Sequence, residues 1–210
     1  MPDTLPNIIA ALKNVLESKD QIRDQVLRNA RRSRMLSKQA IMLIHNSENA
    51  EARNNLEEAK EILSEMLLLF DIVPELEYFE EVKASKEEYA EALIFQNLLR
   101  EETYVTPEEV EVEPLSYLMG LGDVSGELRR EVLTALKKGD IETAEGLFIL
   151  MEDIYFNLVT CEKLSLLLRG LRRKIDITRG VIERTRGDIT TEIGHQRLIK
   201  QINTLLEKKS

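Results

Sequence analysis

The fold class is decided by residues 7–45, NIIAALKNVLESKDQIRDQVLRNARRSRMLSKQAIMLIH, which begin a stretch without helix-breaking residues. Neither glycine nor proline occurs from Asn7 through Val73, and glycine first appears at Gly120. Because glycine and proline interrupt helices most strongly, the helix formers here can continue with few breaks. Apolar residues recur every three or four positions, with Lys19 in the one missing place: Leu5, Ile8, Leu12, Val15, Ile22 and Val26. This spacing predicts a long helix whose apolar stripe faces a partner helix.

The same helical pattern continues to the C-terminus, interrupted by turn residues. After the first helix, which is expected to end near residue 45, helices are expected over about 48–71, 85–101, 115–136, 141–158, 162–186 and 192–207, with a short one at 106–109. No linker, low-complexity tract or internal repeat separates these segments. The sequence therefore predicts an all-α bundle of about seven helices that forms one domain over residues 1–210.

Local signals mark several of the expected helix ends. Ser47 is the predicted N-cap of the second helix and Ser85 that of the third, with Glu88 as its capping-box partner. Pro107 takes the first position of the short helix, where its missing N–H has no partner to lose. The pair Gly139-Asp140 is expected to separate two longer helices.

A second apolar seam lies on the helix expected over 162–186. Its members alternate by four and three, which is heptad spacing: Leu164, Leu168, Leu171, Ile175, Thr178 and Ile182. Two such seams on a chain of 210 residues are more apolar stripe than a small bundle needs. We therefore expect a homo-oligomer.

The composition excludes several classes of protein. Contents of 43% hydrophobic and 32% charged residues are typical of a soluble globular chain. The single cysteine, Cys161, excludes an intramolecular disulfide framework. The N-terminal residues contain no basic segment followed by an apolar run, which is the pattern of a secretory signal. No stretch approaches the roughly 18 apolar residues of a membrane span. We expect a cytoplasmic protein that does not enter a membrane.

The net charge of −9 hides a strong asymmetry along the chain. Residues 51–113 carry 19 acidic and 5 basic side chains, whereas the remainder has a net charge of +5. Two basic clusters supply that excess: Arg28, Arg31, Arg32, Arg34 and Lys38, and later Arg169, Arg172, Arg173, Lys174, Arg179, Arg184 and Arg186. Each cluster is either a phosphate-binding surface or an ordinary solvated helix face. The candidate nucleic-acid-binding residues chosen from them are Arg28, Arg32, Arg172 and Arg173.

Two pairs of carboxylates have the spacing that places both members on one helix face. Glu88 and Glu91 are three residues apart, and Asp123 and Glu127 are four apart. Three glycines accompany the second pair, at Gly120, Gly122 and Gly126. Because glycine within a helix costs about 1 kcal/mol relative to alanine, close helix approach or access for a substrate backbone would account for them. From spacing alone, a solvated face is the stronger interpretation of each pair, and Glu88 is also a candidate capping residue.

Brought together, the four carboxylates would suit a divalent metal ion. Mg²⁺ is a hard cation that prefers oxygen ligands in octahedral geometry, and a bound ion activates water and neutralises charge on a phosphodiester. Such a metal site would be formed by Glu88, Glu91, Asp123 and Glu127. Mn²⁺ is the alternative ion.

Both carboxylate segments resemble segments of the Trax subunit of the translin superfamily. Glu88-Tyr89-Ala90-Glu91-Ala92, followed by Phe95-Gln96, is similar to its E-F-V-E-A-x-x-F-Q segment. Residues 117–128, YLMGLGDVSGEL, are similar to its Y-L-x-G-x-A-D-L-T-G-E-L segment, which combines glycines, two acids and a tyrosine in one register. The resemblance extends over most of the chain. A long insertion of Trax before the second segment is missing here, so the chain looks like a compact prokaryotic or archaeal member.

The resemblance implies a translin-like helical fold and a function. In that family the Trax subunit is the Mg²⁺-dependent nuclease for single-stranded RNA, whereas translin binds nucleic acid and lacks the full acidic set. Residue by residue, the catalytic acids of Trax fall on Glu88, Glu91, Asp123 and Glu127. The resemblance also implies phosphate contact inside a hollow octamer. The expected activity is hydrolysis of RNA phosphodiesters by metal-activated water.

Two other functions remain as alternatives. A translin-like, non-catalytic protein would bind RNA or single-stranded DNA through the same basic helices. A structural helical scaffold would use the carboxylates for folding alone. The presence of acids at all four family positions favours the enzyme.

Overall fold

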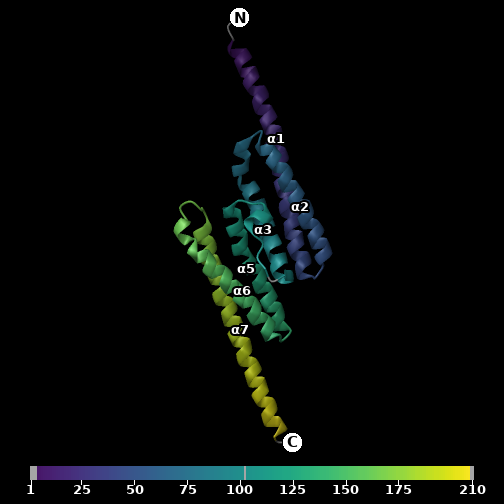
Figure 1. Ribbon diagram of the computed structural model, residues 1–210, viewed down its shortest axis with the longest axis vertical. Coiled ribbons are helices and arrows are strands. Elements are labelled where there is room, and N and C mark those ends of the chain that lie inside the picture. Colours follow the sequence, from purple (N-terminus) through teal and green to yellow (C-terminus); the bar gives the residue numbers. More distant parts are fainter. Residues whose placement is uncertain (1–3, 102, 209–210) are drawn as a thin grey trace. The chain divides into compact units, whose positions relative to one another are not determined.

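A computed structural model describes residues 4–101 and 103–208, and every regular element within them is helical, which confirms the all-α prediction (Figure 1). The elements are α1 (Leu5–His45), α2 (Asn49–Phe70), the 3-10 helix η1 (Pro74–Tyr78), α3 (Glu80–Glu101), α4 (Pro107–Val110), α5 (Pro114–Lys137), α6 (Ile141–Thr160), the 3-10 helix η2 (Glu162–Leu164) and α7 (Leu171–Glu207). The chain divides into two compact units, Met1–Ser116 and Tyr117–Ser210. The single-domain organisation stays a prediction. Within the described ranges, no helix has the length and apolar character needed to cross a membrane.

The first unit is built on α1 and α2, which turn back on each other through a tight connection (Figure 1). Small side chains are buried along both helices, among them Ala30, Ser33, Ala40, Ala52 and Ala59. Such residues allow two helices to approach closely, and here the Ser33 hydroxyl donates a hydrogen bond to the Ala59 carbonyl at 3.3 Å. α3 packs against both helices and adds fully buried apolar side chains to the core.

The beginning of α1 departs from the prediction that its apolar stripe faces a partner helix. Of the six stripe residues, only Ile22 and Val26 pack in the core of the first unit. The other four are exposed: Leu5 by 69%, Ile8 by 43%, Leu12 by 54% and Val15 by 57%. The reason is length, because α1 has 41 residues and α2 only 22. Since both rise about 1.5 Å per residue, α2 cannot cover the first turns of α1.

Two of the predicted helix ends are confirmed. Thr106 and Glu109 form a reciprocal capping box at the start of α4, with Pro107 in its first position. After the break at residue 139, the Asp140 side chain caps α6 by accepting a hydrogen bond from the Thr143 N–H at 3.0 Å. Each signal involves only residues within a few positions of one another, so it could be identified from the sequence alone.

Two other predicted N-caps are wrong. α3 begins at Glu80, directly after η1, so Ser85 lies inside the helix and its hydroxyl donates to the Val82 carbonyl at 2.7 Å. The N-cap of α2 is Glu48, and Ser47 precedes it in a left-handed turn conformation. In both places a serine that suits a cap lies elsewhere: Ser85 within the helix, where its hydroxyl bonds the preceding turn, and Ser47 in the turn before α2.

The second unit contains α6, α7 and most of α5. α7 packs along α6 and also contacts α5, where the Arg129 guanidinium donates to the Thr185 hydroxyl at 2.8 Å. The predicted heptad seam is buried from the first residue of α7 onward, at Leu171, Ile175, Thr178 and Ile182. This part of the seam is confirmed as a core-facing stripe.

The predicted start of that helix at residue 162 is wrong. α7 begins only at Leu171, after η2 and a turn. Gly170 precedes it at φ +90°, a left-handed conformation that a helix cannot contain. The first predicted seam residue, Leu164, is therefore outside α7 and 51% exposed.

The separate last helix expected over 192–207 is also wrong, because α7 continues without a break to Glu207. Gly187 lies in its middle without interrupting it. The buried residues Ile182, Thr185 and Ile189 keep helical spacing across this glycine, so burial of one face holds the helix together.

Candidate active site

Glu88 lies on α3 with two cations from α1 beside it. Arg34 Nε donates a hydrogen bond to Glu88 Oε2 at 3.2 Å, and Lys38 Nζ lies 3.7 Å from the same oxygen. Arg34 and Lys38 are one helical turn apart and share a face of α1. The Glu88 side chain is 15% exposed, whereas those of Arg34 and Lys38 are 48% and 54% exposed. A largely buried carboxylate is thus compensated by cations that solvent reaches.

Glu91, one turn further along α3, is buried, and the flanking residues Ala90 and Ala92 have no exposed surface. Because carboxylates are rarely buried without compensating interactions, Glu91 does not belong to a solvated helix face. The interior position of Ser85 also removes the capping role considered for Glu88. The interpretations that spacing alone favoured are therefore wrong for this pair.

Asp123 on α5 is held by a lysine from α7. The Lys174 Nζ lies 2.5 Å from Asp123 Oδ2, and the lysine side chain is 14% exposed while that of Asp123 is 39% exposed. The Lys174 stem runs against Gly122, where an added Cβ would meet Cγ at 2.5 Å and Cδ at 2.9 Å. Any other residue at position 122 would therefore displace the lysine. Gly122 provides the close helix approach that the sequence suggested.

Glu127 follows Asp123 by one turn and is partly exposed. Val124 and Leu128, which are adjacent to these acids in the sequence, have no exposed surface. The second pair therefore lies at the edge of a hydrophobic core, as expected. Gly126 is different from Gly122, because a Cβ at Gly126 would meet open space. Close packing does not explain that glycine.

The two carboxylate pairs belong to different units, with Glu88 and Glu91 in the first and Asp123 and Glu127 in the second. Among residues 4–101 and 103–208, no three side chains of His, Cys, Asp or Glu form a ready metal-binding group. Each unit by itself supplies one pair of carboxylates. A shared site with four ligands stays a prediction.

The cations that contact Glu88 and Asp123 are not among the four chosen from the sequence. Arg32 donates twice to Glu58, at 2.8 and 3.2 Å, and Arg172 lies 3.5 Å from Glu162. Arg28 and Arg173 are exposed on α1 and α7. A nucleic-acid-binding role for these four arginines stays a prediction. Arg34, Lys38 and Lys174 belong to the same clusters, but only the packing between helices shows which acids they meet.

Lys86 is a buried cation that sequence reasoning missed. Its side chain is 8% exposed, and Nζ lies 3.2 Å from Glu77 and 3.0 Å from Glu113. Burial raises the pKa of Glu113, but the hydrogen bond and charge of Lys86, together with hydrogen bonds from its own backbone and from Ser116, lower it by more, so the net pKa lies below its usual value. The available signal was its position as one of only five basic residues within the acidic stretch 51–113.

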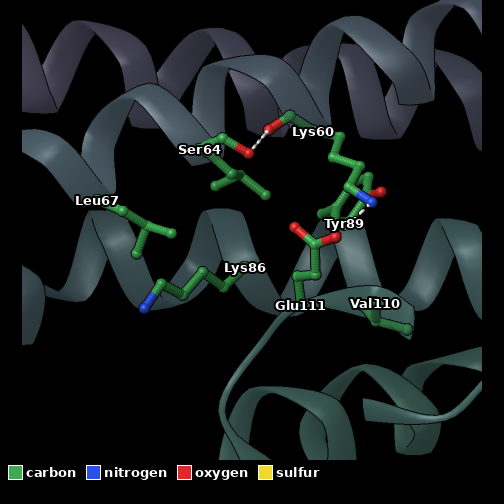
Figure 2. A pocket seen from close by; sticks show the side chains of 8 residues that line it. Lys60, Ser64, Leu67, Lys86, Tyr89, Val110 and Glu111 are labelled. Atoms are coloured by element: carbon green, nitrogen blue, oxygen red, sulfur yellow. Dashed lines mark hydrogen bonds and ion pairs between the residues drawn. The ribbon is translucent and has the colours of Figure 1, made fainter. Parts of the chain in front are cut away.

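Figure 2 shows a small cavity beside Lys86, lined by Lys60, Tyr89 and Glu111 among others. Its volume of about 20 Å³ has room for roughly one water molecule. Lys60 pairs with Glu111 at 2.7 Å, and burial, together with the charge of Glu111, raises the pKa of Tyr89 to about 12. A nucleotide needs a far larger space. This cavity is therefore too small to be a nucleotide site.

Comparison with known proteins places these features in context. The model of the Translin family matches residues 21–185. An uncharacterised protein of Methanocaldococcus jannaschii is 31% identical over 189 residues, which cover 89% of this chain and 83% of that protein.

Solved structures of C3PO proteins are similar over nearly the whole chain. The crystal structure of AfC3PO is 34% identical with a TM-score of 0.80, covering 89% of this chain and 97% of that one. AfC3PO in complex with duplex RNA gives 33% identity with the same TM-score and coverage. The crystal structure of apo-NeC3PO is 25% identical, with a TM-score of 0.80 over 90% of this chain and 99% of that one. The predicted translin-like helical fold is confirmed.

Proposed function

The chain belongs to the translin family, and from this premise we propose that it is a metal-dependent endoribonuclease that hydrolyses phosphodiester bonds in single-stranded RNA. One observation carries the proposal. Acids are present at all four positions expected of the nuclease subunit, and in each unit one of them, Glu88 or Asp123, is held by a cation from a second helix. A side chain fixed in this way is oriented before its ligand arrives, as catalytic groups require.

The chemistry of the donor set fits Mg²⁺, with Mn²⁺ as the alternative. Carboxylate oxygens are the ligands that both ions prefer. Cationic groups already lie against Glu88 and Asp123, which marks their oxygens as positions where positive charge is favourable. We propose that Glu88, Glu91, Asp123 and Glu127 hold the ion or ions in one centre. When bound, Mg²⁺ supplies an activated water and neutralises charge on the phosphodiester.

The side chains of the protein have distinct tasks in this proposal. The carboxylates would hold the metal ion in a fixed orientation, and one of them would accept the proton of the attacking water. Arg34 and Lys38 are half exposed, so they can exchange Glu88 for a phosphate oxygen of the RNA. A similar phosphate contact is proposed for the four arginines chosen from the sequence: Arg28, Arg32, Arg172 and Arg173.

RNA as the ligand is supported by the similarity to AfC3PO, whose complex with duplex RNA has been solved. For the present chain, single-stranded RNA is the proposed substrate. Duplex RNA and single-stranded DNA of the same sequence are the comparison ligands. Cleavage of the single strand at the highest rate would support this choice, and preferential cleavage of the duplex would overturn it.

Cleavage of a 5′-labelled single-stranded RNA by the purified chain, with Mg²⁺ or with EDTA, tests the proposal. We expect cleavage only with metal, and a loss of about 100-fold in Asp123→Asn and in Glu91→Gln. Glu51→Gln and Glu145→Gln change exposed acids elsewhere in the two units and should cleave at the parental rate. Parental activity of Asp123→Asn, or activity in EDTA, would overturn the proposal.

A second candidate function is RNA binding without catalysis. The ion pairs of Arg34 with Glu88 and of Lys174 with Asp123 favour it, because carboxylates that serve only the fold would be compensated in the same way. RNA binding by a chain that cleaves no RNA in Mg²⁺ or Mn²⁺ would establish this alternative.

We also propose that the protein assembles into a homo-octamer. The exposed apolar residues at the start of α1 support an oligomer, because the first unit leaves them uncovered. Light scattering should give eight times the 24.2 kDa of the chain. A monomer mass at micromolar concentration would contradict the assembly.

A further inference from the structure

Three helices of the second unit meet at Gly122. The Lys174 stem from α7 lies where a Cβ of Gly122 would be, and a methyl group of Leu158 from α6 would lie 3.6 Å from that Cβ. Thr178, one turn after Lys174, donates its hydroxyl to the Gly122 carbonyl at 3.4 Å and is 1% exposed. Two residues on one face of α7 are thus fixed to a single residue of α5.

This packing restricts where the Lys174 ammonium can be. The side chain is only 14% exposed, and its stem has the surface of Gly122 on one side. A lysine on an open surface moves among many rotamers, whereas a buried stem loses that freedom. The ammonium is therefore kept beside the Asp123 carboxylate and does not exchange among several positions.

We infer that Lys174 is a positioning residue that holds the Asp123 carboxylate in place before Mg²⁺ binds and competes with Mg²⁺ for it. The inference rests on the proposed function, in which Asp123 is a metal ligand. An ammonium and a metal ion at one carboxylate repel each other. Removal of the lysine charge should therefore strengthen Mg²⁺ binding, while the loss of orientation should slow turnover. Replacement of a purely structural lysine would not strengthen Mg²⁺ binding.

Lys174→Met tests the inference, because methionine keeps an unbranched stem against Gly122 without the charge. Isothermal titration of Mg²⁺ into RNA-free protein should show affinity about tenfold tighter than in the parent. The kcat for RNA cleavage should fall about tenfold. Lys174→Arg retains the cation and should bind Mg²⁺ within about twofold of the parent. Lys200→Met, an exposed lysine of the same helix, is the control and should change neither value.

Gly122→Ala provides an independent variant, because it displaces the stem while both charged groups remain. It should shift Mg²⁺ affinity and kcat in the same directions as Lys174→Met. Circular dichroism identifies any variant that fails to fold. In that case the comparison of Lys174→Arg, which retains the charge, with Lys174→Gln, which removes it, decides the question.

The outcomes separate this inference from the proposed function. If Asp123→Asn neither weakens Mg²⁺ binding nor slows cleavage, the proposed function and the role of Lys174 both fail. If Asp123→Asn does both, but Lys174→Met binds Mg²⁺ with parental or weaker affinity, only the role of Lys174 is overturned. Tighter Mg²⁺ binding with slower turnover in Lys174→Met supports both.

Discussion

The two candidate acid pairs are compensated in opposite ways. In the first unit the acid is less exposed than its cations, with Glu88 at 15% and Arg34 and Lys38 at 48% and 54%. In the second unit the acid is more exposed than its cation, with Asp123 at 39% and Lys174 at 14%. In each case the less exposed partner is the one whose position the packing fixes.

This difference shows which partner of each ion pair is free to change. The exposed cations of the first unit can leave Glu88 for a phosphate. The free energy needed to separate this ion pair falls with increasing salt, because dissolved ions screen exposed charges. In the second unit packing fixes the Lys174 ammonium, and the Asp123 carboxylate is the partner that solvent reaches. Similar salt bridges thus predict different consequences, depending on which side of the pair is buried.

The largest expected effect concerns the two acid pairs together. Glu88→Gln and Asp123→Asn should each reduce cleavage about 100-fold, and the double variant should lose little more than either single one. Such non-additivity is expected if both acids serve one centre. Single-turnover cleavage rates of the three variants measure it. Losses that multiply in the double variant would indicate that the two acids serve independent sites.

A second test contrasts the buried Lys86 with the less fully buried Lys174. Lys86→Met in the first unit leaves Glu77 and Glu113 without their cation, but these acids are 42% and 40% exposed, so water compensates in part. We expect a loss of about 2 kcal/mol in the free energy of unfolding, below the 3–5 kcal/mol typical of a fully buried pair. Urea unfolding measures this loss. Unchanged Mg²⁺ binding would distinguish Lys86 from Lys174.

The exposed cations of the first unit should affect RNA affinity. Arg34→Met with Lys38→Met should weaken RNA binding about tenfold and flatten its salt dependence, at about 0.7 in log–log slope per lost phosphate contact. Fluorescence anisotropy over a salt series measures both values. The pair Arg172→Met with Arg173→Met should flatten the slope similarly if those arginines contact phosphates. An unchanged slope in either double variant would show that its cations lie away from the RNA.

The smallest expected effect is the contribution of Glu113 to acid stability. Its pKa is lowered in the folded protein, so its stabilisation is complete above the unfolded pKa of about 4.3 and is lost as the pH falls through the folded value. Compared with the parent, Glu113→Gln should be less stable at pH 7 by under about 1 kcal/mol, because the group is partly exposed. Unfolding free energies from pH 7 to 3 should converge in acid. A constant difference would exclude the linkage to Lys86.

Local signals predicted the helical class and several helix ends, but contacts between helices required the structure. The Thr106 capping box and the Gly139-Asp140 break depend on neighbouring residues, and both are present. Ser85 has the same local chemistry as a cap, yet the helix starts earlier because η1 leads directly into it. No spacing rule connects Lys174 to Asp123, because the two helices meet only when α7 packs on α5.

The acid positions themselves were accessible from the sequence because two acids on one helix face form a local pattern. Burial was not accessible in this way. Glu91 looked like part of a solvated helix face because it lies three residues from Glu88, but the packing of α3 buries it. The acid that each basic side chain meets was inaccessible for a similar reason. Charge density identifies a cluster, whereas partner identity depends on the facing helix.

The missing side chain at Gly122 also has a consequence for inheritance. The space that Gly122 leaves is filled by the stem of Lys174, so the two positions form one steric unit although they lie far apart in the chain. A change at either position alone should be selected against, whereas a larger residue at 122 could persist with a shorter one at 174. Among relatives of this protein we therefore expect the two positions to vary together. Such covariation would be evidence for the contact between the two residues that requires no measurement of cleavage.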